Sequence, residues 1–347
     1  MYPSLDDKLF GVFVKNFKEE IEAQDAVISE TSLIKGKSKS KIKKLFRYIK
    51  HYIKILNIYL NGHYDIIYIH YVSHHIPILL LMIIFKKSPI IINVHGSDIT
   101  FIKKNFFLKY AVDLIFKKVD RVVSPSISLK KSLLMSFKNV IDSRVYVYPS
   151  GGINSSAFYP IQVEKNNTLH LGFVSRIIAN KGWKVFLDAL KILKENHIDF
   201  KATIAGKGKD ESSLIRLIEK YDLKNTEFVG FVDQQKLFRL YNKFDLYIFP
   251  TLNDSLGLTG LEAMACGTPV IASDIDGPST YVKNGQNGYL FNVNDFDGLA
   301  NKIMFYRTLS QSQKINFKEN ALKTASYYDK SLVTKKLLIE MKSLINT

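Results

Sequence analysis

The sequence predicts an α/β protein with two Rossmann-like domains. Short apolar runs alternate with helix-like patterns, which is typical of parallel strand–helix units. A chain of 347 residues, 46% of them apolar, has enough material for two domains with separate cores. A stretch dense in Gly, Ser, Asn and Pro, 148–160, separates two such series. We therefore expect a first domain over 1–155, a second over 156–330, and a C-terminal helix within 331–347 that one interpretation has bridging back to the first domain.

The first series of strands starts late in the chain. A doubly wound domain ordinarily opens with a buried central strand, but no strand pattern precedes Tyr2. We interpret the first domain as lacking its first strand, and expect a form extended upstream of Met1 to behave better in solution. Strands are expected at 64–70, 89–94, 121–124 and 145–148, with a helix over the apolar run 76–85.

The second series is more regular. Strands are expected at 169–174, 200–205, 226–228, 245–249 and 270–272, and helices at 183–195, 210–221 and 258–266. The last helix places Leu332, Leu337, Leu338, Met341, Leu344 and Ile345 mostly on one side, so it must cover an apolar surface.

Composition excludes several classes of protein. The longest apolar run, 76–85, is half of what a bilayer-spanning helix needs, and the N-terminus lacks the apolar core of a secretory signal. Cys266 is the only cysteine, so the chain can form neither an internal disulfide nor a zinc site with several cysteine ligands. This favours a reducing, cytoplasmic setting. His70, His74 and His75 are close in sequence, but we interpret them as core or loop residues rather than metal ligands.

The positive charge is concentrated in the first half of the chain. The net charge is +17, of which residues 1–165 carry +12. The stretch Lys35–Leu60 has nine basic residues and no acid, and its apolar residues recur at three- and four-residue steps. Such a helix can lie on an anionic membrane, or it can pack its apolar face on the core with its lysines solvated. Nucleic-acid binding is disfavoured because the block matches no docking motif.

The segment 249–277 carries the most chemical information. A strand ends at Phe249, a loop holds Asp254 and a capping candidate, Ser255, and a helix then runs to Cys266. The first amides of this helix, Leu256, Gly257 and Leu258, lack helical partners and lie at the positive end of its dipole, which suits a phosphate. Glu262 could accept bonds from two sugar hydroxyls. Alternatively, Asp254 and Ser255 only cap the helix and Glu262 is a surface acid.

A second loop favours the functional interpretation. The loop 174–182 follows the first strand of the second domain, and ligands of open α/β sheets bind beyond this edge. It carries Arg176 and Lys181, two cations that could neutralise a diphosphate leaving group. The loop 205–210, AGKGKD, could border a base or a phosphate, but it is neither a full dinucleotide fingerprint nor a P-loop.

Segments along the whole chain, taken in sequence order, resemble those of the GT-B glycosyltransferases of family 4. These are retaining enzymes that use nucleotide sugars. The matching segments are YPSLDDKLFGVFVKNF, VHGSD, YPSGGIN, VSRIIANKG, AGKGKD, FVGFV, 254–262 and NGQNGYLF, and they span nearly the whole chain. The resemblance implies two domains that face a cleft. One departure is Thr280, which stands where an acid is common.

The resemblance also implies roles for single residues. Arg176 and Lys181 would contact the donor diphosphate and Glu262 the ribose. Asp254 stands at the place of a glutamate that faces the transferred sugar, and is one methylene shorter. In the first domain, His95 would lie near the sugar, while Gly11 and Asp98 belong to the acceptor side.

The expected activity is hexosyl transfer with retention, from a nucleotide sugar, UDP favoured over GDP, to a growing, lipid-linked surface glycan. This implies polysaccharide biosynthesis by a cytoplasmic protein, peripheral on the inner face of the membrane, with no metal, cofactor or nucleic acid. Two alternatives remain: a sugar-nucleotide epimerase of the same fold, and a non-catalytic membrane-surface protein on a decayed transferase scaffold.

Overall fold

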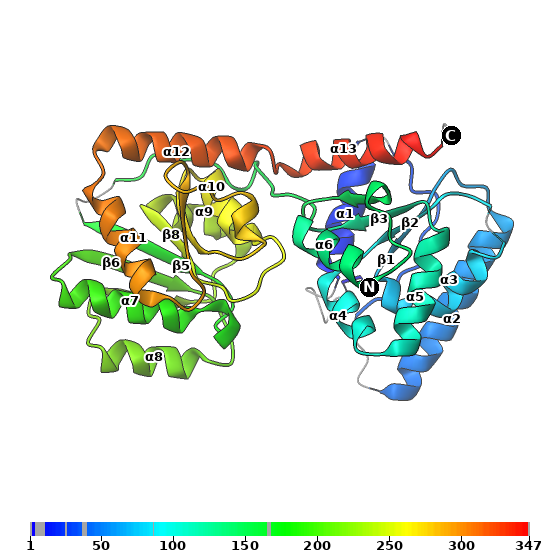
Figure 1. Cartoon of the computed structure of the whole chain (residues 1–347), viewed down its shortest axis with the longest axis horizontal. Coiled ribbons are helices and arrows are strands. Elements are labelled where there is room, and N and C mark those ends of the chain that lie inside the picture. Colours follow the sequence, from blue (N-terminus) through cyan, green and yellow to red (C-terminus); the bar gives the residue numbers. More distant parts are fainter. Residues whose placement is uncertain are drawn as a thin grey trace. The chain divides into compact units, whose positions relative to one another are not determined.

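The computed structural model describes residues 2–3, 11–24, 26–36, 40–85, 87–164 and 168–345. The chain forms two compact units (Figure 1). Unit 1 comprises Met1–Gly152 and Lys330–Thr347, and unit 2 comprises Ile153–Asp329. The chain passes between them after 152 and after 329, against expected boundaries after 155 and 330. Both units are built around parallel sheets, which confirms the predicted fold class.

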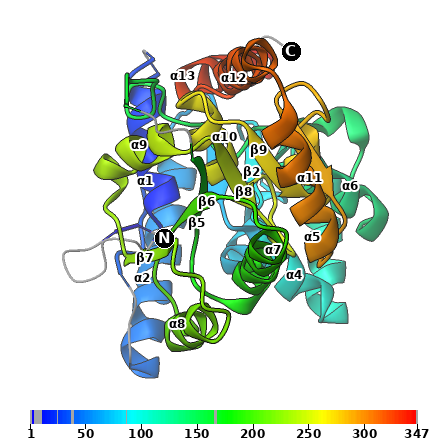
Figure 2. The same ribbon diagram turned by 90° about the vertical axis from the view of Figure 1, so that its left-hand side faces the viewer.

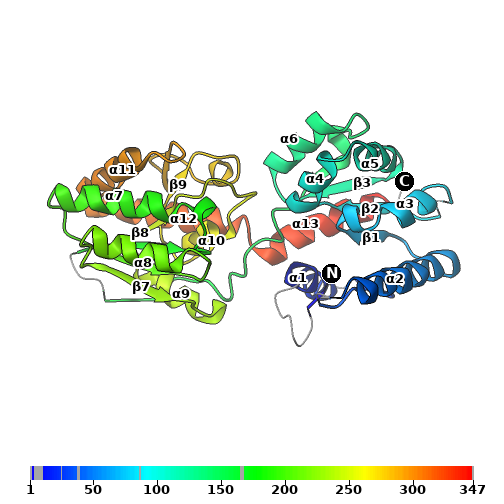
Figure 3. The same cartoon turned by 90° about the horizontal axis from the view of Figure 1, so that it is seen from below.

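Unit 1 contains a four-stranded parallel sheet in the order β1-β2-β3-β4. Its strands are β1 (Ile67–His70), β2 (Ile90–Asn93), β3 (Arg121–Ser124) and β4 (Val145–Val147). One face packs on α3 (Ile76–Met82), α4 (Gly96–Lys103), α5 (Phe106–Lys118) and α6 (Ile127–Ser136), and the other on α1 (Val12–Glu22) and α13 (Lys330–Ser343) (Figure 3). No strand precedes β1 in the part of the chain that the structure describes. A largely apolar cavity of about 620 Å³ lies beside β1, against α1, α2 (Lys41–Asn61) and α13.

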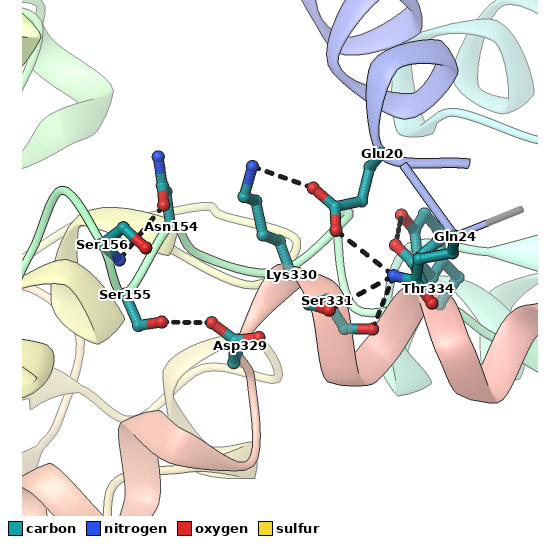
Figure 4. Close-up of polar contacts among 10 residues, drawn as sticks. Glu20, Gln24, Asn154, Ser155, Ser156, Asp329, Lys330, Ser331 and Thr334 are labelled. Atoms are coloured by element: carbon teal, nitrogen blue, oxygen red, sulfur yellow. Dashed lines mark hydrogen bonds and ion pairs between the residues drawn. The ribbon is translucent and has the colours of Figure 1, made fainter. Parts of the chain in front are cut away.

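The last helix, α13, belongs to unit 1 although it follows unit 2 in sequence. Its buried residues Val333, Leu337 and Leu338 pack with Phe17 and Ile21 of α1. Figure 4 shows its polar contacts with α1 and with Gln24, which follows α1: Lys330 Nζ lies 2.8 Å from Glu20 Oε2, and Gln24 Nε2 donates to the Ser331 carbonyl at 2.9 Å. The apolar surface that the sequence demanded for this helix is therefore supplied by α1 and the sheet of unit 1.

Unit 2 contains a six-stranded parallel sheet in the order β10-β9-β8-β5-β6-β7. Its strands are β5 (Leu169–Val174), β6 (Phe200–Ala205), β7 (Thr226–Gly230), β8 (Leu246–Phe249), β9 (Val270–Ser273) and β10 (Gly288–Phe291). Helices α7 (Trp183–Glu195), α8 (Glu211–Lys220) and α11 (Phe296–Thr308) cover one face, and α9 (Gln234–Lys243), α10 (Leu258–Ala265) and α12 (Gln311–Ser326) the other (Figure 2). The strand order reverses between β5 and β8, which makes the carboxyl ends of these two strands the expected ligand site.

The basic helix α2 packs on the core with a face that the sequence analysis did not single out. It contacts the core through Tyr52, Ile55 and Tyr59, not through the apolar face that the sequence singled out. On that face only Leu56 packs on the core. Its other members are 45–69% exposed: Ile42, Leu45, Phe46, Ile49, Ile53 and Leu60. The interpretation in which this face packs on the core is wrong, because a second set of apolar residues takes that role.

Two structural features are absent from the described residues. None of the helices is both long and apolar enough to cross a membrane. No group of three or more His, Cys, Asp or Glu side chains is placed to hold a metal ion in the described ranges.

Candidate functional site

The loops that follow β5 and β8 are joined at the carboxyl edge of the unit 2 sheet. The Leu252 amide donates to the Asn180 carbonyl at 2.9 Å. Gly182 adopts a left-handed conformation, with φ of 74°, and a Cβ at this position would lie 1.8 Å from the Pro250 carbonyl oxygen. Only glycine fits both requirements, so Gly182 holds the two loops in contact.

This junction brings together two of the predicted site residues. Lys181 Nζ lies 2.7 Å from Asp254 Oδ2, and the two side chains are only 12% and 22% exposed. The sequence assigned Lys181 to the diphosphate and Asp254 to the sugar, without pairing them. Their ion pair places a cation and a carboxylate at one point of the sheet edge.

Arg176 lies on the same loop and is exposed. No acid of the described residues forms an ion pair with it. Backbone bonds fix its neighbours: the Ser175 amide donates to Ala205 and the Ile177 amide to Lys207, both at 3.1 Å. The guanidinium therefore projects from a rigid loop as a free cation, as a site for an anion requires.

The loop after β6 packs closely against the loop after β5 at two glycines. A Cβ at Gly206 would lie 1.7 Å from the Ser175 carbonyl oxygen, and one at Gly208 would lie 2.1 Å from that of Ile177. These glycines allow close backbone packing of the loops after β5 and β6, and thereby support Arg176.

The helix α10 begins at Leu258, as predicted, but its N-cap lies two residues after the predicted one. Its N-cap is Gly257, in a left-handed conformation with φ of 83°, and no side chain caps it, so the prediction that Ser255 caps is wrong. Tyr281 Oη donates to the Gly257 carbonyl at 3.0 Å and fixes this turn. The amides of Leu256, Gly257 and Leu258 make no hydrogen bond to any described residue. Three donors therefore remain available at the positive end of the helix dipole.

Glu262 lies one turn further along α10 and is buried. The Tyr241 hydroxyl of α9 donates to its Oε2 at 3.0 Å. Burial raises the pKa of Glu262 to about 7, against the opposing effect of this hydrogen bond. The alternative of a solvated surface acid is wrong. Sequence reasoning missed Tyr241, because nothing in the local pattern of α9 distinguishes it from a core tyrosine.

In unit 1, His95 and Asp98 lie where β2 gives way to α4. His95 is the N-cap, and Asp98 at the third helical position accepts from the His95 amide at 2.9 Å. The imidazole stacks on the Tyr71 ring with centroids 3.8 Å apart. Burial lowers the pKa of His95 to about 3 and raises the pKa of Asp98 to about 7. The imidazole is thus neutral at physiological pH.

Several buried polar atoms around His95 lack a hydrogen-bond partner among the described residues. They are Nε2 of His95, Oδ2 of Asp98 and both ring nitrogens of His70. His70 ends β1 and His95 follows β2, so these atoms gather at the carboxyl edge of the unit 1 sheet. Unpaired buried polar groups are rare and often mark a ligand site. Sequence reasoning assigned His70 to a core or loop role.

Two further predicted residues have structural positions of their own. Gly11 is the N-cap of α1, in a left-handed conformation with φ of 70°. Thr280, which departs from the family pattern, donates its hydroxyl to the Gly277 carbonyl at 2.6 Å. A Cβ at Gly277 would meet the Asp254 carbonyl oxygen at 2.5 Å, so this turn packs on the loop that carries Asp254.

Family models match residues in both units of the chain. The family "Glycosyl transferases group 1" matches residues 157–324, and "Glycosyl transferase 4-like" matches residues 5–126. An uncharacterized glycosyltransferase of Methanocaldococcus jannaschii is 26% identical over 86% of this chain and 80% of its own length. The N,N'-diacetylbacillosaminyl-diphospho-undecaprenol alpha-1,3-N-acetylgalactosaminyltransferase of Campylobacter jejuni is 22% identical over 71% of this chain and 68% of its own.

A solved structure shares the fold. The Anabaena protein HepE in complex with UDP superimposes with a TM-score of 0.71 and 20% identity, covering 90% of this chain and 86% of that protein. Family models match both units, the relatives are glycosyltransferases, and the solved structure shares the fold. These findings lead to one assignment. The chain is a glycosyltransferase with the GT-B fold, of the family 4 type.

Proposed function

We propose that the protein transfers a hexose from a nucleotide sugar, UDP favoured over GDP, to a growing lipid-linked surface glycan, with retention at the anomeric carbon. The observation that carries the donor assignment is the junction at the sheet edge of unit 2. The loops after β5 and β8 follow neighbouring strands and hydrogen-bond to each other. They carry the exposed guanidinium of Arg176, the ion pair of Lys181 with Asp254, and three amides without a partner among the described residues. The Campylobacter relative, whose name includes an undecaprenol diphosphate, supports a lipid-linked acceptor.

The proposed reaction needs no covalent enzyme intermediate. The acceptor hydroxyl oxygen forms the new bond to the anomeric carbon while the bond from that carbon to the diphosphate oxygen breaks. The hydroxyl proton passes to the departing diphosphate. Arg176, Lys181 and the amides at Leu256–Leu258 stabilise the negative charge that grows on the diphosphate. Positive charge supplied in this way suffices without a metal.

The remaining residues position the reactants. The Glu262 carboxylate accepts hydrogen bonds from the ribose hydroxyls, and Asp254 faces the transferred sugar from its ion pair with Lys181. The neutral imidazole of His95 offers its unpaired Nε2 to a sugar hydroxyl, while Asp98 fixes the turn that carries it. Gly11 allows the acceptor to approach the start of α1.

The Arg176→Ala variant tests the donor site. Turnover should fall at least 100-fold while the circular dichroism spectrum is unchanged, because the charge on the leaving group loses its exposed counterion. Lys184→Ala is the matched control, since Lys184 pairs with Asp188 on the surface of α7 and should retain near-normal turnover. Near-normal turnover of Arg176→Ala would contradict the donor assignment.

Product analysis separates the proposal from its two rivals. A transferase releases UDP only when an acceptor is present, whereas an epimerase changes the donor without one. A decayed scaffold releases no UDP even with a lipid-linked glycan. UDP release that depends on the acceptor would support transfer.

The same proposal places the protein peripherally on the inner face of the membrane, through α2. Its outer apolar stripe (Ile42, Leu45, Phe46, Ile49 and Ile53) is exposed, and six lysines and arginines with no acid lie along the same helix. Such a helix gains from burying apolar area and from anionic headgroups, about 1 kcal/mol for each basic residue near the surface.

Vesicle sedimentation tests the role of α2. The full chain should sediment with vesicles that contain phosphatidylglycerol and be released by salt. Phe46→Ser combined with Ile49→Ser should reduce the bound fraction, and no binding of the wild type at low salt would contradict the proposal.

A further inference from the structure

Four large apolar or aromatic side chains crowd the corner between α4 and α5. Phe106 and Phe107 are 77% and 81% exposed, and Phe101 and Tyr110 are also exposed. Scattered exposed apolar residues are ordinary, but neighbouring aromatic rings in one place mark a binding surface. With Lys103, Lys104 and Lys109, these residues define the α4–α5 corner.

The exposure of the two phenylalanines is built into the local structure. The Asn105 side chain caps α5 by accepting from the Leu108 amide at 3.1 Å, so Phe106 and Phe107 are the first two residues of the helix. The opposite face of α5 is buried, through Val112, Ile115 and Phe116. Because cap and core fix the rotation of α5, the two rings have no route into the core of unit 1.

The outward face continues along the helix. Tyr110 lies three and four residues after Phe107 and Phe106, and Leu114 lies four residues after Tyr110, so they share one side of α5. Both Tyr110 and Leu114 are exposed. The result is an apolar stripe that begins at the corner rather than a single displaced ring.

Charge identifies the partner. No acid occurs between Asp98 and Asp113, while three lysines lie among the exposed rings. Lys103 donates to the Ser132 hydroxyl at 3.0 Å rather than to a carboxylate. Exposed aromatic rings flanked by lysines suit the interface of an anionic bilayer, where rings lie at headgroup depth and ammonium groups meet phosphates.

A second feature of the same unit points to the same partner. Unit 1 carries 28 basic and 13 acidic residues, a net charge of +15, whereas unit 2 carries 21 and 19. The outer stripe of α2 combines exposed apolar side chains with lysines in the same way. The start of α2 and the helices α4 and α5 all lie toward the lower side of unit 1 in Figures 1 and 2.

We propose that the α4–α5 corner is a second membrane contact, which inserts Phe106 and Phe107 into the headgroup region of an anionic bilayer. This rests on the proposed function only in that a lipid-linked acceptor gives membrane contact its purpose. A single helix tethers unit 1, whereas two separate contacts also fix its orientation on the bilayer and bind more tightly than either alone.

Partition of the full chain into vesicles tests the proposal. Vesicles of phosphatidylglycerol and phosphatidylcholine in equal parts are compared with phosphatidylcholine alone. The double variant Phe106→Ser/Phe107→Ser should lower the partition coefficient into the anionic vesicles at least tenfold. The control Phe231→Ser removes a ring that is 67% exposed in unit 2 and should leave partition unchanged. Equal partition of the double variant and the wild type would overturn the proposal.

Insertion is measured separately with Phe107→Trp. The emission of the new tryptophan should shift to the blue on anionic vesicles and be quenched by lipids brominated on the acyl carbons next to the headgroup, while buried Trp183 supplies the background from the wild type. Absence of quenching would overturn the proposal, as would a dimer that the double variant abolishes without any vesicle binding. UDP should raise the thermal midpoint of unit 2 equally in the wild type and in all variants. If UDP does not raise the midpoint of the wild type, the proposed function is contradicted, whereas membrane insertion stands or falls by its own measurement.

Discussion

At the residue scale, the buried carboxyl of Glu262 predicts a stability effect with a definite sign. Its pKa is raised from an ordinary 4.5 to about 7 because α10 and its neighbours exclude water from it. Between these two pH values, the folded state therefore keeps the Glu262 proton that the unfolded chain releases. This group stabilises the fold fully below pH 4.5, and that contribution is lost as pH rises through 7.

Glu262→Gln should therefore stabilise the protein at pH 8, by up to about 3 kcal/mol, with no gain near pH 4.5. Chemical denaturation followed by Trp183 fluorescence at both pH values measures the difference. Glu227→Gln is the control, since Glu227 is exposed on β7. A gain that is equal at both pH values would contradict the burial argument. If Glu262→Gln also binds UDP more weakly, the negative charge of Glu262 serves UDP binding and lowers the stability of the fold.

The contacts of single residues are also where sequence reasoning reached its limit. It selected Lys181 and Glu262 individually from their residue types and their positions in a loop and a helix, and the family resemblance added the role of Asp254. It did not find the ion pair of Lys181 with Asp254, whose partners are 73 residues apart, or the bond from Tyr241 to Glu262. Such pairs depend on which strands become neighbours, and periodicity does not specify this.

At the scale of elements, the sequence predicted most of the strands around the site and the start of α10 at Leu258, but not the residue that caps this helix. Short apolar runs identify parallel strands in a sequence. Ser255 is a residue type that often caps helices, but the turn at Gly257 packs against Phe249, and Gly257 becomes the N-cap instead. β10 was missed, although β1, an edge strand of the same length, was predicted. In α2, apolar spacing predicted the helix correctly, but two apolar faces compete for one core, and only the structure shows which is buried.

The turn at Gly257 leads to a prediction with a matched control. Gly257 and Gly230 both have positive φ, 83° and 70°, so Ala should cost about 1–2 kcal/mol at either position for conformation alone. A Cβ at Gly257 would also lie 2.3 Å from the Phe249 ring, whereas nothing lies within 4 Å at Gly230. Gly257→Ala should therefore cost about 1–3 kcal/mol more than Gly230→Ala.

Denaturant titration measures these free energies, and UDP binding provides the functional counterpart. Gly257→Ala should weaken UDP binding because it displaces the free amides, while Gly230→Ala should bind normally. Equal effects of the two substitutions on both properties would show that the turn does not position the helix amides.

At the scale of the whole molecule, the two units divide the chemistry. Unit 1 carries nearly all of the net charge, the exposed stripes of α2 and the α4–α5 corner, and the His95 cluster. Unit 2 is nearly neutral and holds every residue proposed to contact the diphosphate and the ribose of the donor. Because each unit has its own buried core, a ligand of one unit should raise the stability of that unit in particular.

Trp183 makes this division measurable. It is the only tryptophan, it is buried, and it starts α7 directly after Gly182 in unit 2. UDP at one hundred times its dissociation constant adds about 2.7 kcal/mol to the state that binds it. The thermal midpoint reported by Trp183 fluorescence should therefore rise by roughly 5–10 °C. Far-UV circular dichroism, which senses helices of both units, should show a component from unit 1 that UDP leaves in place. Lys181→Met should reduce the shift, whereas Lys184→Met should keep it. A Trp183 midpoint unmoved by saturating UDP and GDP, or a shift confined to unit 1, would contradict the assignment of the donor to unit 2.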